Sequence, residues 1–90
     1  MSQEALEDAA QSLREAAEAA DDEENRERLE NQSETLAGFA EDDSGVDHGR
    51  LARHEHIIGS IAEDEGGDVA DRADDALESI HAYRETLEGV

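Results

Sequence analysis

The stretch from residue 47 to residue 62, DHGRLARHEHIIGSIA, constrains the fold more than any other part of this sequence. It holds the densest cluster of branched apolar side chains in the chain. Four of its residues recur at spacings of three and four, which places them on one stripe of an α-helix. They are Leu51, His54, Ile58 and Ile61. We therefore expect a helix here, and we expect it to be the central core helix.

The same periodicity predicts three more helices, at about residues 3–20, 23–41 and 69–88. The helix that contains the stretch described above is expected to begin after its N-cap, Asp47, and to end at about Asp64. Turns are predicted at residues 42–45 and at Gly66-Gly67, because Asp, Ser and Gly tolerate turn geometry. The acidic run at residues 21–24 predicts a third connection. The alternative is one continuous long helix, because neither Gly nor Pro interrupts it; loop length and core burial favour the break.

These elements predict an all-α fold in a single domain of residues 1–90. We expect a four-helix, up-down antiparallel bundle made of two helical hairpins, hairpin 1 at about residues 2–43 and hairpin 2 at about 44–90. A weak internal repeat at an offset of 44 residues aligns Leu13 with Ile57 and Leu36 with Ile80. It indicates either two similar hairpins or simply two amphipathic hairpins of equal length. Gly59 costs about 1 kcal/mol inside its helix, which a close helix crossing would justify.

The core of such a bundle is thin. Large apolar side chains are few, and alanine, which favours helix but buries little area, supplies much of the remainder. At about 25 cal/mol per Å² of buried apolar surface, the margin over chain entropy is slight. Self-association would bury more surface, so we expect a homo-oligomer, most simply a dimer.

Charge is the strongest signal in the composition. Twenty-seven Asp and Glu face seven basic residues, all of them Arg, for a net charge of -20. In ordinary buffer a chain of this charge would fall near the class of intrinsically disordered proteins. Salt can screen the repulsion between its carboxylates, because the Debye length falls from about 10 Å at 0.1 M to about 3 Å at 1 M. A salt-rich cytoplasm would suit the protein. Naked nucleic acid and anionic membranes are not expected partners, since binding either relies on Lys and Arg, and no apolar run has the length of a membrane span.

Two segments carry a resemblance to a known group of proteins. They are residues 47–54, DHGRLARH, and residues 83–90, YRETLEGV. In these, the chain resembles a family of small acidic haloarchaeal proteins of unknown function, and the resemblance extends over the whole chain. It implies a salt-rich cytoplasm and brings no catalytic signature, so it assigns no site.

Histidine is the only residue type that offers chemistry. Glu78 and His81 have the Glu-x-x-His spacing of carboxylate-bridged metal bundles, but such sites need a second element of this kind, which the chain lacks. His54 could bind zinc together with His81, although a histidine at a core boundary is more often hydrogen-bonded to a neighbour. A metal-binding bundle using His54, Glu78 and His81 is therefore the alternative hypothesis. No phosphate loop, Cys nucleophile or serine elbow is present, so we expect neither an enzyme nor a cofactor.

The principal hypothesis rests on the only local excess of positive character, at residues 48–56. Arg50 and Arg53 are three residues apart and share a helix face. They could dock an acidic partner, a phosphate or the acidic side of a second copy. The more ordinary expectation is that they pair with acidic neighbours, because acids greatly outnumber bases. We expect a non-catalytic protein–protein interaction module or small regulator, with Arg50 and Arg53 on its partner surface. A third hypothesis, an acidic mimic of nucleic acid, rests on charge alone.

Overall fold

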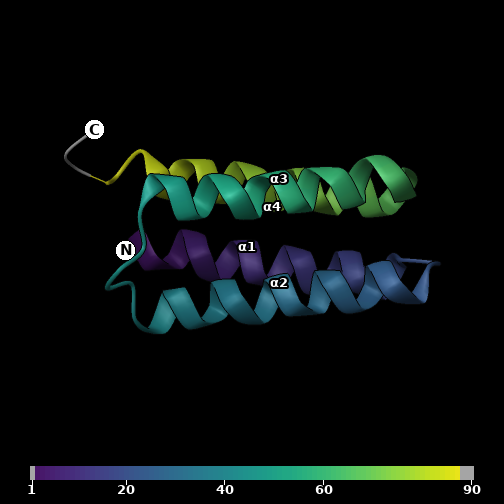
Figure 1. Cartoon of the computed structure of the whole chain (residues 1–90), viewed down its shortest axis with the longest axis horizontal. Coiled ribbons are helices and arrows are strands. Elements are labelled where there is room, and N and C mark those ends of the chain that lie inside the picture. The colour runs from purple at the N-terminus through teal and green to yellow at the C-terminus, as the bar shows by residue number, and fades with distance from the viewer. Residues whose placement is uncertain (1, 88–90) are drawn as a thin grey trace.

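Four α-helices make up the computed structural model, which describes residues 2–87 (Figure 1). They are α1 (Ser2–Ala19), α2 (Glu23–Glu41), α3 (His48–Glu65) and α4 (Gly67–Arg84). The helices lie side by side along a body whose longest dimension is 39 Å. The predicted antiparallel four-helix bundle, with an α1–α2 hairpin and an α3–α4 hairpin, is confirmed.

The acidic run after α1 is a connection. Asp22 has an extended backbone and acts as the N-cap of α2: its Oδ1 accepts hydrogen bonds from the backbone N of Glu24, at 2.8 Å, and of Asn25, at 3.2 Å. These bonds satisfy donors that the first turn of a helix leaves without a partner. A new helix can therefore begin here without Gly or Pro. The predicted break is confirmed, and the alternative of one continuous helix is wrong.

The second hairpin has a shorter turn than predicted. Asp47 is the N-cap of α3, as predicted, and its Oδ1 accepts from the backbone N of Arg50 at 2.8 Å. Gly66 ends α3 with a φ of +68°, a conformation that glycine adopts without a Cβ clash. It alone separates α3 from α4. The last helix ends at Arg84, and the predicted end at residue 88 lies outside the described residues.

The helix with the most extensive contacts is α1, which packs against both α2 and α4. Its inner stripe alternates leucine with alanine, so neighbouring helices can approach closely. Every member is at most 2% exposed: Leu6, Ala9, Ala10, Leu13, Ala16, Ala17 and Ala20. The expectation that α3 is the central helix is wrong. Its residues Leu51, Ile58 and Ile61 are fully buried, but α3 packs mainly on α4 and shares its smaller interface with α2.

The buried residues of the two hairpins correspond to one another, but the difference in residue number is not the same for α1 and α3 as it is for α2 and α4. Leu13 and Ile58 correspond at an offset of 45 residues, whereas Leu36 and Ile80 correspond at 44. The offset changes because the turn between α3 and α4 is the shorter one. The alignment of Leu13 with Ile57 is therefore wrong by one residue, and Ile57 is only half-buried.

Gly59 lies in the middle of α3, but no other helix crosses close to it. A Cβ atom built on this glycine would meet no heavy atom within 4 Å. The close crossing that would justify a glycine here is therefore not found among the described residues. The folded chain itself does not require a glycine at this position.

Candidate functional site

The inner stripe of α3 carries three polar side chains at positions where α1 has alanine. The corresponding pairs, with the α1 residue first, are Ala9 and His54, Ala10 and Glu55, and Ala20 and Glu65. The alanines are buried, whereas all three polar residues are half-buried. His54 and Glu65 bond to α2 and to the connection before it, and Glu55 bonds to α4, so these side chains help to fix the position of α3.

Glu65 ties the end of α3 to the start of α2. Its Oε1 accepts a hydrogen bond from the backbone N of Asp21 at 3.2 Å, and its Oε2 accepts from the backbone N of Asp22 at 3.3 Å. Asn25 is only 4% exposed, and its Nδ2 donates to Glu65 Oε2 at 2.8 Å and to Asp64 Oδ2 at 2.7 Å. A buried amide needs such acceptors, because an unsatisfied donor is costly. This corner is therefore a structural polar cluster in which every group has a partner.

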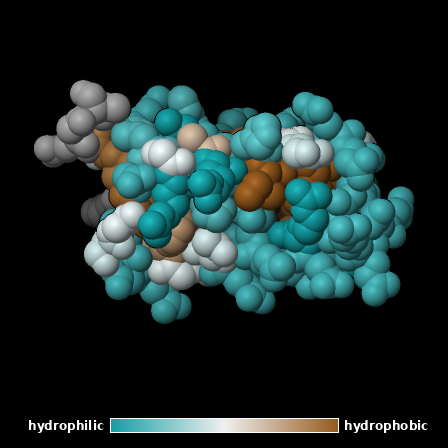
Figure 2. Space-filling view, in the orientation of Figure 1, coloured by the Kyte–Doolittle hydropathy of each residue, from teal (hydrophilic) through white to brown (hydrophobic). Residues whose placement is uncertain are grey.

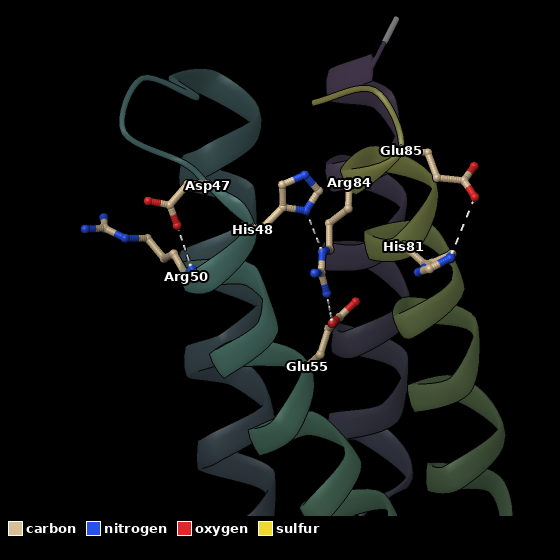
Figure 3. Close-up of polar contacts among 7 residues, drawn as sticks. All are labelled: Asp47, His48, Arg50, Glu55, His81, Arg84 and Glu85. Carbon is tan, nitrogen blue, oxygen red and sulfur yellow. Dashed lines mark hydrogen bonds and ion pairs between the residues drawn. The ribbon is translucent and has the colours of Figure 1, made fainter. Parts of the chain in front are cut away.

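Glu55 ties α3 to α4 through Arg84 (Figure 3). Arg84 Nη1 lies 2.6 Å from Glu55 Oε1, and the two side chains are 26% and 21% exposed. Arg84 Nε also donates to His48 Nδ1 at 3.1 Å. Because His48 Nδ1 accepts, the ring hydrogen is on Nε2, which is buried and has no hydrogen-bond partner in the described part of the chain. The charge of Glu55 is thereby neutralised inside the α3–α4 interface.

His54 faces α2 and binds to it. Its Nδ1 lies 2.7 Å from Gln32 Oε1, an acceptor, so Nδ1 carries the ring hydrogen and Nε2 can accept. The ring of Phe39 meets the imidazole edge-to-face, with centroids 5.7 Å apart and the planes at 69°. Partial burial lowers the pKa of His54, and the positive charges of Arg50 and Arg53 lower it further. This is the arrangement of a boundary histidine held neutral by its surroundings.

A hollow of about 580 Å³ opens beside His54, where α2 and α3 diverge. Its lining combines an apolar wall with two cations and one carboxylate. The lining residues are Thr35, Phe39, Asp47, Gly49, Arg50, Arg53 and His54. Asp47 is occupied as the N-cap of α3, and in Figure 3 the guanidinium of Arg50 extends away from its carboxylate.

Neither Arg50 nor Arg53 follows the ordinary expectation of pairing with acidic neighbours. Within residues 2–87, neither guanidinium makes an ion pair within 4 Å or a hydrogen bond. Arg84, in contrast, is bonded to Glu55, and Arg72 lies 3.7 Å from Glu15. Arg14, Arg26 and Arg28 also lack an ion pair within the described residues, but only Arg50 and Arg53 line the hollow beside His54 together.

The residues of the metal-binding hypothesis are not brought together. His54 lies between α3 and α2, whereas Glu78 and His81 line a hollow between α3 and α4. His81 Nε2 lies 3.7 Å from Glu85 Oε2, and both side chains are 71% exposed. No group of three or more metal-ligating side chains occurs among the described residues. We therefore build no function on this set.

The outward side of α3 differs in charge from the other helices. Between residues 48 and 62, the sole carboxylate is Glu55, which faces Arg84. The exposed residues of this segment form a surface that we call the acid-free face: Gly49, Arg50, Ala52, Arg53, His56 and Ser60. Figure 2, viewed with α3 in front, shows pale and brown surface in this region, with teal surface around it. No helix in the described chain is long and apolar enough to cross a membrane.

A family model matches residues 1–86, nearly the whole chain, and its description is a family of unknown function, DUF7553. The chain belongs to the DUF7553 family. No curated protein and no solved structure matches it. Membership therefore assigns no activity to the DUF7553 chain.

Sequence reasoning located Arg50, Arg53 and His54 in the DUF7553 chain, but it missed the polar corner at Asn25 and Glu65. A signal for Asn25 was present. Asn25 precedes Leu29 by four residues, which places an amide on the buried stripe of α2 and implies a polar partner from another helix. Nothing local identified Glu65 as that partner, because it lies 40 residues away.

Proposed function

We propose that this DUF7553 protein is a non-catalytic interaction module that binds another protein on the acid-free face of α3. Arg50 and Arg53 would be its charged anchors. The observation that carries the proposal is that two arginines without an ion-pair partner within the described chain lie together on one side of α3, beside a hollow that Phe39 also lines.

The chemistry of the acid-free face favours a carboxylate-bearing protein. A guanidinium offers a planar fork of donors that matches a carboxylate in a bidentate pair. Beside it, the hollow presents the half-buried ring of Phe39 and the neutral imidazole of His54, which suit an apolar or aromatic side chain. A partner segment that carries an apolar residue flanked by acids would satisfy both parts.

Nucleic acid and membranes fit this surface poorly. Two arginines do not offset a net charge of -20, and long-range repulsion would oppose the approach of any polyphosphate or anionic bilayer. A protein partner presents a limited number of charges, and molar salt screens the remaining repulsion within about 3 Å. The hydroxyl that lines the hollow, that of Thr35, donates to the backbone O of Asn31 at 3.0 Å, which supports a binding role without catalysis.

Charge reversal with a matched control tests the proposal. The double variant Arg50→Glu, Arg53→Glu and the control Arg14→Glu, Arg72→Glu change the net charge equally, but the control residues lie on α1 and α4. Affinity capture in molar potassium chloride should recover a protein with the wild type and with the control, and at least about tenfold less of it with the double variant. Equal recovery with all three chains would sink the proposal. Circular dichroism verifies that all three are folded.

We also propose that the protein works in a salt-rich cytoplasm of the haloarchaeal kind. Its charge and its lack of Lys support this, as does a bundle whose exposed positions outside α3 are largely acidic. Lowering potassium chloride from molar to about 0.1 M should loosen the helices, because the Debye length rises to about 10 Å. Helical circular dichroism that stays unchanged across this range would contradict the screening argument.

A further inference from the structure

The outward side of α3 has charges of opposite sign at its two ends. Arg50 and Arg53 stand near its start, and the exposed Glu63 and Asp64 stand near its end. Between them lie only uncharged exposed residues and the neutralised Glu55. Glu63 makes no hydrogen bond or ion pair within residues 2–87. Arg53 and Glu63 are ten residues apart, about 15 Å along a helix that rises about 1.5 Å per residue.

This order of charges is complementary to itself when the direction of the helix is reversed. If a second α3 lies antiparallel on the first, with a two-fold axis near the level of Ile58, Arg53 of each copy stands beside the partner's Glu63. Arg50 then lies toward the partner's Asp64. Symmetric contacts of this kind are the rule in homodimers, since residue i of one copy meets residue j of the other and the reverse.

We propose that the occupant of the acid-free face is a second copy of this chain, with its α3 antiparallel to the first and two reciprocal Arg53–Glu63 pairs. The proposal rests on the proposed function and names its partner. It also follows from the charge distribution. α1, α2 and α4 expose carboxylates along their outward sides, so pairing two copies through any of these faces would oppose acid to acid. Pairing through α3 avoids this repulsion.

Gly59 supports the same arrangement by an independent observation. A glycine inside a helix costs about 1 kcal/mol relative to alanine, and among the described residues no heavy atom beyond the nearby backbone of α3 lies within 4 Å of the Cβ that an alanine would add. Gly38 in α2 has the same open space, but the exposed side of α2 carries carboxylates. Gly59 lies next to the level of the proposed two-fold axis, and Ala52 and Ser60 on the same side are also small. A second helix could therefore approach the backbone of α3 closely at this point, as small residues permit in tight helix pairs.

The register of the pair provides a direct test by charge swapping. In molar potassium chloride, analytical ultracentrifugation of the wild type should show a dimer of the 9.8 kDa chain. Arg53→Glu alone and Glu63→Arg alone should each weaken the dimer about tenfold or more, since each opposes like charges twice. The double variant Arg53→Glu, Glu63→Arg restores both pairs and should dimerise again.

Mixing the two single variants makes the test stricter. A chain with Arg53→Glu and a chain with Glu63→Arg complement each other at both pairs, so an equimolar mixture should dimerise while each variant alone stays largely monomeric. Circular dichroism of each variant verifies the fold. A monomeric wild type, single variants as dimeric as the wild type, or a mixture that fails to dimerise would each overturn the proposal.

The outcomes also separate this inference from the proposed function. If the wild type is monomeric but charge reversal at Arg50 and Arg53 still abolishes capture of a different protein, the acid-free face binds that protein and only the second copy is excluded. If charge reversal changes neither capture nor sedimentation, both proposals fail. Dimerisation that obeys the charge swap supports both.

Discussion

α1 and α3 occupy corresponding places in the two hairpins, but different forces hold them. The inner stripe of α1 consists of leucine and alanine and contacts two helices extensively. The inner stripe of α3 has three buried branched residues, while polar side chains take the places of three alanines. α1 is held by close packing, and α3 is held in part by hydrogen bonds and one ion pair to its neighbours.

This difference shows how a chain with few large apolar side chains can form a bundle and still leave the outward side of α3 open to another molecule. Two neighbouring helices, α2 and α4, cover the small residues of α1, which buries its inner stripe. Polar side chains position α3 at the margin with fewer contacts, so its outward side stays open. The absence of acids from that side then makes it the place where another molecule meets the least repulsion.

The largest expected effect comes from removing packing in α1. Leu13→Ala should lower the free energy of unfolding by roughly 2–5 kcal/mol, because it deletes a fully buried side chain and leaves a cavity. The matched control is Ile57→Ala, which removes as many carbons from a half-buried position of α3 and should cost less than half as much. Urea titration in molar salt, followed by circular dichroism, measures both. Equal losses of unfolding free energy in the two variants would contradict the difference between α1 and α3 described above.

A smaller effect is expected from removing a polar tie of α3. Glu65→Ala should lower the free energy of unfolding by about 1–2 kcal/mol, because Asn25 and two backbone donors lose an acceptor. Glu18→Ala on α1 is the control: it removes the same charge from an exposed side chain. The same titration compares them. If both changes have the same effect, the corner at Glu65 does not hold α3.

The smallest expected effect is a pH dependence at His54. Its folded-state pKa is lowered, so on acidification the unfolded chain takes up a proton first, near pH about 6.5, and the folded chain only at lower pH. Stability contributed by the neutral ring is thus present above that pH and is lost as pH falls below it. His54→Gln should lose less stability than the wild type between about pH 7.5 and 5.5.

The control for this measurement is His56→Gln, which makes the same substitution at an exposed histidine of the same helix. All three chains share the same carboxylates, so the gain in stability from their protonation cancels in the comparison. Identical pH profiles for the wild type and His54→Gln would show that the environment of His54 does not couple to folding.

Local patterns predicted most of the fold. The spacing of apolar residues located all four helices, and Asp47 identified the start of α3, because periodicity and capping depend on residues near in sequence. The central position of α1 was not predictable in this way. An alanine stripe indicates a buried face, but whether one helix or two cover it depends on residues far along the chain, and α3 has the larger apolar side chains.

The candidate site was predicted in part for the same reason. The positive cluster around Arg50 and Arg53 is visible in the sequence, since its members are neighbours on one helix. The sequence does not show that these arginines lack ion-pair partners, because the nearby acids bond to other groups. Glu55 bonds to Arg84 of α4, and Asp47 caps the N-terminus of α3. Only the three-dimensional arrangement shows which charges are left over.

The extensive contact between α1 and α4 joins the first helix of the bundle to the last. During synthesis, residues 20–66 must leave the ribosome before α4 can cover the alanine stripe of α1. Until then the nascent α1 can shield only the side that α2 packs against. The interface between α1 and α4 therefore forms only after α4 has been synthesised, so the first hairpin alone does not complete the core.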